Sequence, residues 1–143
     1  MIKIAQIGVG YWGPNLLRNL LKNKSFELKV IVDKSQQRLD YVKSLYPNIK
    51  VNLDSDIIFN DDQIDAVVIS TPAKSHFSLA MRALKSGKHI LVEKPMATSS
   101  DEVEKIEIIA KKNNLIAMSG HTFIYNSAVD YLKNLIDAND WFV

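Results

Sequence analysis

The stretch IGVGYWGPN, residues 7–15, carries three glycines in the spacing G-x-G-x-x-G. Taken alone this spacing is weak, because glycine-rich turns are common in proteins. Its surroundings make it informative: the apolar run 2–7 predicts a strand before the turn, and leucines at helical spacing predict a helix after it. Asp33 then ends the next apolar run, about 20 residues further on. Together these features predict a turn that binds the pyrophosphate of a dinucleotide.

Each position of the turn has an expected role. Gly8 is expected to form the tight turn, Gly10 to let a pyrophosphate approach the backbone, and Gly13 to bring the helix close to the strand. Tyr11 and Trp12 fill the two variable positions of the motif. We expect both to contact a cofactor mainly through their backbone N–H groups, and packing in a lid or in the core is the alternative.

The composition indicates one globular domain. The chain has 143 residues, of which 47% are hydrophobic and 24% are charged. The formal net charge of +2 comes from scattered lysines, so no nucleic-acid partner is expected. No apolar run reaches the roughly 20 residues of a membrane span and no long apolar leader is present, which predicts a cytoplasmic protein without membrane contact. Without cysteine, and with three histidines that lack metal-ligand spacing, no metal site is expected.

Apolar runs that favour strands alternate with helical patterns. Strands are expected at 2–7, 27–32, 49–51, 66–70, 88–92 and 115–119. Helices are expected between them, one of which stops at Gly87 and another of which starts at Ser99, with Glu102 completing a capping box. Near-continuous apolar strands suit a parallel sheet that is covered on both faces. The sequence therefore predicts an α/β fold, a doubly wound parallel sheet of Rossmann type with six strands and flanking helices.

Asp33 also bears on which dinucleotide is bound. Its carboxylate is placed to accept hydrogen bonds from the adenosine ribose hydroxyls, and its charge would repel a 2′-phosphate. NAD is therefore favoured over NADP. Lys34 and Arg38 follow closely and would stabilise the additional phosphate if they turned inward, which keeps NADP possible; an ordinary solvated helix start is the alternative for both.

A second group of functional side chains follows the fourth and fifth strands. Ser70, Thr71 and Pro72 come after one, and Glu93 and Lys94 come after the other. Both segments are expected at the carboxyl edge of the sheet, where ligands of such folds bind. A charged residue beside a buried strand needs a partner or exposure, so Lys94 is expected to face a cleft. A surface pair between Glu93 and Lys94 is the alternative.

These segments resemble a known family. The sequence ISTPAKSHFSLAMRALKSGKHILVEKPMA, residues 69–97, together with IGVGYWGPN and SGHTFIYNSAV, is similar to the amino-terminal half of the glucose-fructose oxidoreductase, inositol dehydrogenase and rhizopine-catabolism (Gfo/Idh/MocA) family. The glycine turn, T-P-x-x-x-H and E-K-P occur in this order, and the resemblance covers essentially the whole chain. It implies NAD(P)-dependent oxidation or reduction at a hydroxyl or carbonyl of a sugar or nucleotide-linked sugar.

The resemblance also assigns roles to residues. It implies that Lys94, the lysine of E-K-P, lies beside the nicotinamide and the substrate, where it orients the hydroxyl and helps its proton to leave. It further implies that several residues line the cofactor or the cleft, namely Thr71, Pro72, His76, Glu93 and His121. Without the motif, His76 would be interpreted as a capping or core histidine.

Members of this family have a second, carboxy-terminal domain that holds substrate contacts and usually the surface for oligomerisation. The resemblance therefore implies a dinucleotide-binding domain at 1–125, with 126–143 as a connecting helix and the start of a further domain. Substrate binding and a homo-oligomer would then require the full-length protein, and this chain alone is expected to be inactive. Trp141, Phe142 and Val143 have the pattern of a new strand, and a terminal segment docked on the same domain is the alternative. The alternative function is a stand-alone, non-catalytic NAD-binding module.

Overall fold

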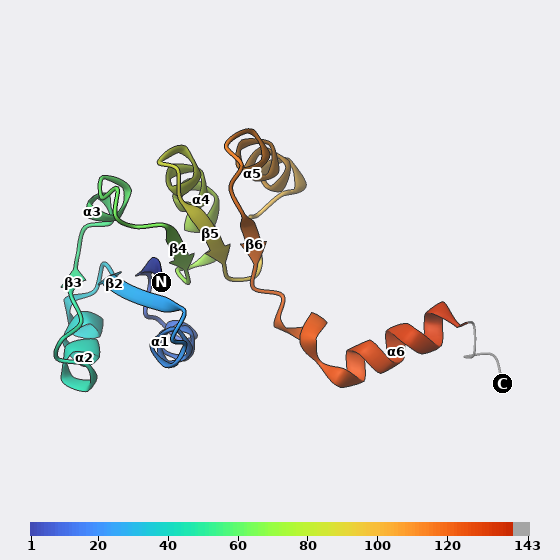
Figure 1. Cartoon of the computed structure of the whole chain (residues 1–143), viewed down its shortest axis with the longest axis horizontal. Helices are drawn as coiled ribbons and strands as arrows, with labels where there is room; N and C mark the ends of the chain where they lie inside the picture. Colours follow the sequence, from blue (N-terminus) through green and yellow to red (C-terminus); the bar gives the residue numbers. More distant parts are fainter. Residues whose placement is uncertain (139–143) are drawn as a thin grey trace.

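A computed structural model describes residues 1–138 and shows one six-stranded parallel sheet (Figure 1). The strand order is β3-β2-β1-β4-β5-β6. The strands are β1 (Ile2–Ile7), β2 (Phe26–Val32), β3 (Val51–Asn52), β4 (Ala66–Ile69), β5 (His89–Val92) and β6 (Ala117–Ser119). Because β4 pairs with β1 on the side away from β2, the winding direction of the chain reverses between β1 and β4. The predicted doubly wound fold is confirmed.

Helices cover both faces of the sheet. The helices are α1 (Gly13–Lys22), α2 (Gln36–Leu45), α3 (Asp56–Phe59), α4 (His76–Lys85), α5 (Ser100–Lys112) and α6 (Ser127–Asp137), with short 3₁₀ turns η1 (Ala73–Ser75) and η2 (Thr122–Tyr125), and α1 to α5 provide this cover. In Figure 1, α1 and α2 lie below the strands and α3, α4 and α5 lie above them. Each crossover helix thus connects parallel strands, as their geometry requires.

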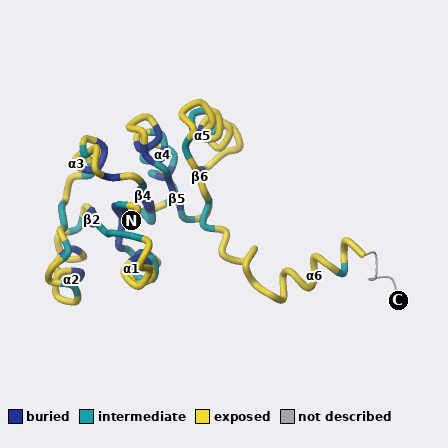
Figure 2. Tube along the Cα trace, in the orientation of Figure 1, coloured by how far each residue is buried: buried dark blue, intermediate teal, exposed yellow. Residues whose placement is uncertain are grey.

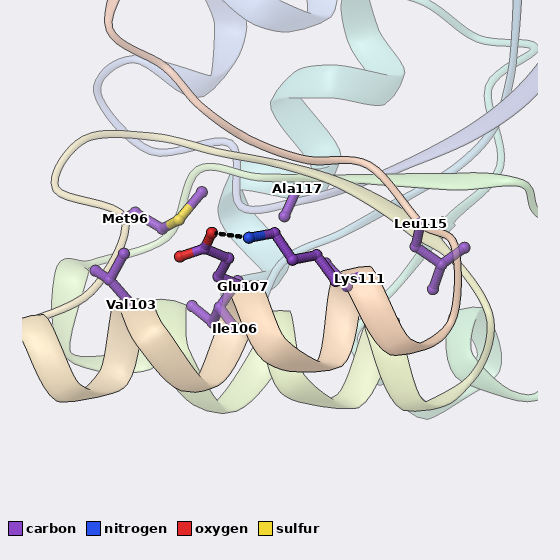
Figure 3. Close-up of a pocket in the computed structure, with 8 residues that line it drawn as sticks. Met96, Val103, Ile106, Glu107, Lys111, Leu115 and Ala117 are labelled. Atoms are coloured by element: carbon purple, nitrogen blue, oxygen red, sulfur yellow. Dashed lines mark hydrogen bonds and ion pairs between the residues drawn. The ribbon is translucent and has the colours of Figure 1, made fainter.

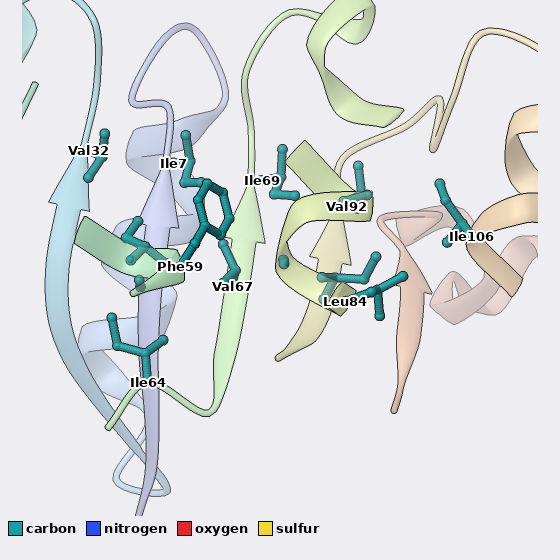
Figure 4. Close-up of a cluster of buried hydrophobic side chains, with 14 of the residues drawn as sticks. Ile7, Val32, Phe59, Ile64, Val67, Ile69, Leu84, Val92 and Ile106 are labelled. Carbon is teal, nitrogen blue, oxygen red and sulfur yellow. The ribbon is translucent and has the colours of Figure 1, made fainter. Parts of the chain in front are cut away.

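The core is divided by the sheet. Side chains alternate along β1, so that Ala5 and Ile7 pack with α3, α4 and α5, while Ile4 packs with α1. The larger cluster (Figure 4) contains Ile7, Val32, Phe59, Ile64, Val67, Ile69, Leu84, Val92 and Ile106. On the other face, Leu17, Leu39 and Val42 pack against Ile31. The apolar strands are therefore covered on both sides, as their composition predicts.

Some element boundaries differ from the prediction. β3 pairs only through Val51 and Asn52, and the expected start of this strand at residue 49 is wrong because the Ile49 N–H donates to the Tyr46 carbonyl at 3.1 Å in the turn after α2. The fifth strand begins at His89 and not at residue 88, because the Lys88 backbone N–H donates to the Ala83 carbonyl at 3.0 Å, in the last turn of α4. The Lys88 side chain is buried, and its Nζ donates to the carbonyl oxygens of Asp61 (2.7 Å) and Ile64 (3.0 Å). The buried lysine thus anchors a loop rather than extending the strand.

Helix α5 begins with the predicted capping box. Ser99 Oγ accepts a hydrogen bond from the Glu102 backbone N–H at 3.3 Å. The Glu102 carboxylate reaches one residue further than expected, to Thr98, where it accepts from N (2.9 Å) and Oγ1 (2.8 Å). These hydrogen bonds lower the pKa of the Glu102 carboxyl. The first turn of α5 is therefore fixed by both side chains.

Helix α6 confirms the helix expected at 126–138, and it extends away from the sheet (Figure 1). Figure 2 shows it exposed along nearly all its length. Val129, Leu132 and Ile136 recur at helical spacing and are 41%, 57% and 57% exposed. The expected strand at residues 141–143 lies outside the described residues. Among residues 1–138, no helix has the length and apolar character needed to span a membrane.

We expect Ser99→Ala to lower the free energy of unfolding by about 1 kcal/mol, because the change removes the side-chain acceptor of the helix start. Urea unfolding followed by circular dichroism measures the difference. Ser100→Ala is the matched control, since Ser100 is exposed and its hydroxyl has no hydrogen-bond partner among residues 1–138. Equal effects of the two substitutions would contradict the assigned cap.

Candidate functional site

The glycine turn between β1 and α1 is confined by the two neighbouring strands. Gly8 has φ +94°, and a Cβ on it would lie 2.7 Å from the backbone carbon and oxygen of Ser70. Its N–H donates to the Val32 carbonyl at 2.7 Å. A Cβ on Gly13 would lie 2.7 Å from the Gly8 carbonyl oxygen. Only glycine fits at either position, so the expected tight turn and close helix packing are present.

Gly10 differs from the other two glycines. The three atoms nearest to a Cβ placed on it belong to the end of the Arg38 side chain, with Nη1 at 3.1 Å. Because a flexible side chain can move, the fold itself does not require glycine here. Absence of a side chain at this position leaves the backbone open to close approach, which is the requirement of a bound pyrophosphate.

The start of helix α1 has no side-chain cap. Trp12 is the N-cap residue, its side chain makes no capping hydrogen bond, and no acidic residue lies in the first turn. Free N–H groups and the helix dipole make such an end suitable for an anion. Tyr11 is 98% exposed and Trp12 is 46% exposed, so neither packs in the core. Their side chains flank the turn and leave its backbone accessible.

Asp33, at the end of β2, is 7% exposed and holds the turn as well as facing the site. Its Oδ2 accepts from the Val9 N–H at 2.8 Å, and its Oδ1 accepts from the Ser35 N–H at 2.9 Å. Carboxylate oxygens accept more than one hydrogen bond, so acceptor capacity remains for ribose hydroxyls. The structural role of Asp33 in fixing the turn was not predicted.

The two cations after Asp33 are placed differently. Arg38 lies over the turn, with Nη1 at 3.8 Å from Asp33 Oδ2. Lys34 is exposed and forms no ion pair among residues 1–138. Of the two residues, only Arg38 is brought to the glycine turn, whereas Lys34 has the solvated placement of the alternative interpretation.

The loops after β4 and β5 are joined by a buried histidine. His76 is 1% exposed, and its two ring nitrogens lie 2.7 Å from the carbonyl oxygens of Thr71 and Pro95. Both partners are acceptors, so a neutral ring donates to one of them at a time. His76 therefore lies beneath the loops and holds them together, and both nitrogens are already in contact with protein. The resemblance implied that His76 lines the cofactor, but its buried side chain is not placed to contact a cofactor directly.

Ser70 and Thr71 point to different partners in the same edge of the sheet. Ser70 Oγ donates to the Gly8 carbonyl at 2.7 Å, which links β4 to the glycine turn. Thr71 Oγ1 lies 2.7 Å from Ser75 Oγ, and Pro72 ends the extended segment before η1. These residues therefore shape the wall of the site next to the turn.

The E-K-P segment lies at the end of β5. Lys94 is exposed, and its backbone N–H donates to Glu93 Oε2 at 3.2 Å. No ion pair joins the side chains of Glu93 and Lys94 among residues 1–138, so the alternative of a surface pair is wrong. A Cβ on Gly120 would lie 3.3 Å from Glu93 Oε1, which shows how closely the end of β6 approaches Glu93. The Lys94 side chain remains free to meet a ligand.

A hollow of about 430 Å³ adjoins the E-K-P segment and lies between the loop after β5 and the end of β6. The residues that line it are Pro95, Met96, Ala97, Thr98, Ser99, Ser100, Val103, Ser119 and His121. His121 is exposed at its rim. A different hollow of about 360 Å³, between α5 and β6 (Figure 3), is apolar apart from the Glu107–Lys111 ion pair. Of the predicted site residues, only His121 lines the first hollow, and none lines the second. Lys94 precedes the lining residue Pro95 and does not itself line either hollow.

Residues 2–121 match the family model described as "Oxidoreductase family, NAD-binding Rossmann fold". The chain belongs to the Gfo/Idh/MocA family. Its resemblance to that family, drawn from three motifs, is thereby confirmed. The chain is an NAD-binding Rossmann domain of the Gfo/Idh/MocA type, and NAD is its cofactor, with NADP also used among similar proteins.

Known relatives are longer than this chain. An uncharacterized oxidoreductase of Streptococcus pneumoniae is 28% identical over 137 residues, which cover 96% of this chain and 36% of the relative. A glycosyl hydrolase family 109 protein of Shewanella baltica is 33% identical over 145 residues, covering 95% of this chain and 32% of the relative. The crystal structure of scyllo-inositol dehydrogenase from Lactobacillus casei, with NAD(H) and scyllo-inositol bound, is similar with a TM-score of 0.86 and 27% identity, covering 98% of this chain and 42% of that one. The chain thus spans well under half of each relative.

The residues present fit the dinucleotide of the Gfo/Idh/MocA family. The turn carries glycine where a Cβ would meet the next strand, an open backbone at Gly10, an uncapped helix start and a buried acid at the end of β2. Sequence reasoning missed Gln6, which is buried below the turn and donates to two of its carbonyls. A glutamine in the otherwise apolar run 4–7 was the signal that would have found it.

Replacing Gly10 with alanine is expected to weaken NAD binding about tenfold or more, because the methyl group would stand where the pyrophosphate approaches. The fold should persist, since only the end of Arg38 must move. Calorimetric titration with NAD and thermal unfolding without it measure the two effects. Gly87→Ala is the control: Gly87 has φ +74° at the end of α4, so its replacement should lower Tm and leave NAD affinity unchanged. An unaltered affinity of Gly10→Ala would contradict the assignment.

Proposed function

We propose that this chain is the cofactor-binding domain of an oxidoreductase that transfers hydride between nicotinamide and the hydroxyl or carbonyl carbon of a sugar or nucleotide-linked sugar. The observation that carries the proposal is the placement of an uncapped glycine turn and an exposed Lys94 on the same carboxyl edge of the sheet. Ligands of doubly wound folds bind at this edge, where the winding of the chain reverses. The similar inositol dehydrogenase, which acts on a polyhydroxylated ring, supports the substrate class.

The cofactor half of the site is assigned to the turn and to β2. Backbone N–H groups from Gly10 to Gly13 bind the pyrophosphate, with Tyr11 and Trp12 contributing through their backbone. Asp33 accepts hydrogen bonds from the adenosine ribose, which favours NAD. Arg38 lies over Gly10 and is the residue that would meet a 2′-phosphate or the adenine, so NADP binds as well. It binds more weakly than NAD because the Asp33 carboxylate repels the additional phosphate.

The reacting half is assigned to the loops after β4, β5 and β6. Lys94 lies against the substrate oxygen: in the reducing direction its ammonium group gives the oxygen a proton as hydride arrives at the carbon, and in the oxidising direction its amine accepts that proton as hydride leaves. We assign Thr71, Pro72 and Glu93 to the same side of the site as Lys94, and His121 lines the hollow next to the E-K-P segment. The bound nicotinamide supplies the hydride donor or acceptor. The protein's own contribution is to position the substrate and the nicotinamide and to polarise the reacting bond of the substrate.

We also assign residues 1–125 to the dinucleotide-binding domain and residues 126–143 to a connection into further protein. Exposed apolar side chains along α6 support this division, since such a stripe is normally covered by another surface. The relatives are long enough to contain a further domain, because this chain covers only 36% and 32% of two of them. Substrate contacts and oligomerisation are then properties of the longer protein. A stand-alone NAD-binding module without catalysis is the second candidate.

Titration of this chain with NAD tests the cofactor assignment. We expect a dissociation constant below about 1 mM for NAD and weaker binding of NADP, because the Asp33 carboxylate repels the additional phosphate. Calorimetry measures both. Failure to bind either dinucleotide at millimolar concentration would contradict the enzyme and the module alike.

Lys94→Met in a form of the protein that includes a substrate domain is expected to lower kcat at least about a hundredfold, since it removes the group that assists proton transfer. The assay follows NADH absorbance with a panel of sugars, cyclitols and nucleotide sugars. Glycosides join the panel because one relative is named as a glycosyl hydrolase. NAD affinity of the variant should match the parent. An unchanged kcat would remove Lys94 from the mechanism, and binding without turnover on the whole panel would favour the module.

A further inference from the structure

Gln6 interrupts the apolar strand β1 two residues before the glycine turn. Its side chain is fully buried, at 0% exposed, on the face of β1 that packs against α1. Burying a carboxamide among apolar side chains is unfavourable unless its polar atoms are hydrogen-bonded. The role of Gln6 therefore depends on what its amide contacts.

The amide nitrogen of Gln6 binds both ends of the glycine motif. Nε2 lies 3.0 Å from the Gly8 carbonyl oxygen and 2.9 Å from the Gly13 carbonyl oxygen. Because both carbonyls only accept, this end of the amide is the nitrogen. Nε2 also lies 3.2 Å from Ser70 Oγ, whose own hydrogen goes to the Gly8 carbonyl. One side chain thus connects the first glycine, the last glycine and the end of β4.

Stability alone does not account for this residue. The amide oxygen Oε1 is buried without a hydrogen-bond partner among residues 1–138, which is unfavourable for the fold. The Gly8 carbonyl has a second donor in Ser70 Oγ, so it does not depend on Gln6 for a partner. An apolar side chain of the same length would remove the unpaired oxygen. The presence of glutamine at position 6, with its unpaired amide oxygen, is therefore explained better by its effect on the glycine turn than by its effect on stability.

That effect concerns the direction of the carbonyl groups. With the oxygens of Gly8 and Gly13 held against the buried amide, their partial negative charges stay on the strand side of the turn. A Cβ on Gly13 would be only 2.7 Å from the Gly8 oxygen, so the two ends of the turn are already in close contact above Gln6. The backbone N–H groups from Gly10 to Gly13 have no backbone acceptor among residues 1–138, so they remain available to an anion.

We propose that Gln6 is a positioning residue of the dinucleotide site. Its amide holds the carbonyl groups of Gly8 and Gly13 away from the phosphates, so that the N–H groups of the turn converge on the pyrophosphate. Gln6 itself touches no cofactor atom, because it is covered by the turn. The inference rests on the proposed function of this chain as a dinucleotide-binding domain.

Gln6→Met tests the inference, because methionine keeps the length of the side chain and removes the donor. NAD affinity measured by calorimetry should fall about tenfold, which is roughly the free energy that one hydrogen bond contributes. Tm without NAD should stay within about 4 °C of the parent, since the unpaired oxygen is lost together with the donated bonds. Amide resonances of Gly8, Gly10 and Gly13 should shift in NMR spectra of the free protein.

Ile4→Val is the matched control. Ile4 is 4% exposed on the same face of β1, two residues from Gln6, and packs with Leu20 and Val68. Its truncation should lower Tm and leave both NAD affinity and the glycine resonances unchanged. A role of Gln6 confined to packing would give the same pattern as this control.

Ser70→Ala is a second variant that changes the same group of hydrogen bonds from the end of β4. It provides the test if Gln6→Met does not fold. The substitution removes an acceptor of the Gln6 amide that also donates to the Gly8 carbonyl, so this carbonyl is held by one side chain fewer and NAD affinity should again fall. An unchanged affinity in whichever of the two variants folds would overturn the inference while the parent still binds NAD. No binding by the parent at millimolar NAD would overturn the proposed function, and the inference with it.

Discussion

The contact between Gly8 and the end of β4 is the constraint on which the fold and the site both depend. β1 lies between β2 and β4, so the chain leaving β1 must turn within the space that its two neighbours leave. The Gly8 N–H donates to Val32 on one side, and the Ser70 N–H donates to Ile7 on the other. The Ser70 backbone leaves no room for a Cβ at position 8, so the residue there is glycine, which adopts a positive φ without strain. The chain then enters α1 within a few residues. The same turn leaves the helix start open to an anion.

Buried polar side chains support this edge from below. Four polar or charged residues are buried among residues 1–138, and three of them, Gln6, Asp33 and His76, bind backbone groups of the loops at the carboxyl edge. The fourth, Lys88, anchors the loop that leads from α3 into β4. Because each such residue is unfavourable in a core unless its bonds are made, their concentration under one set of loops indicates that loop shape is what they maintain.

Much of the fold was predictable because it follows from local patterns. Strand and helix periodicity gave six strands and a doubly wound sheet, and the spacing of the glycines with Asp33 gave the turn. β3 was misplaced because two paired residues carry no periodicity of their own. What the sequence could not show was contact between distant residues: Ser70 Oγ meets the Gly8 carbonyl across a separation of 62 positions. The burial of His76 and the second role of Asp33 depend on such contacts as well.

The two halves of the site differ in how far this chain completes them. The proposed pyrophosphate side belongs to a turn that hydrogen bonds to β2, to the end of β4 and to a buried amide hold in place. On the proposed reacting side, by contrast, Lys94 and His121 are exposed to water. A charge in water interacts weakly with a developing negative charge, and the interaction grows only when protein excludes the solvent. Lys94 therefore gains its proposed effect on catalysis from whatever surface closes over it, which makes cofactor binding separable from turnover in this chain.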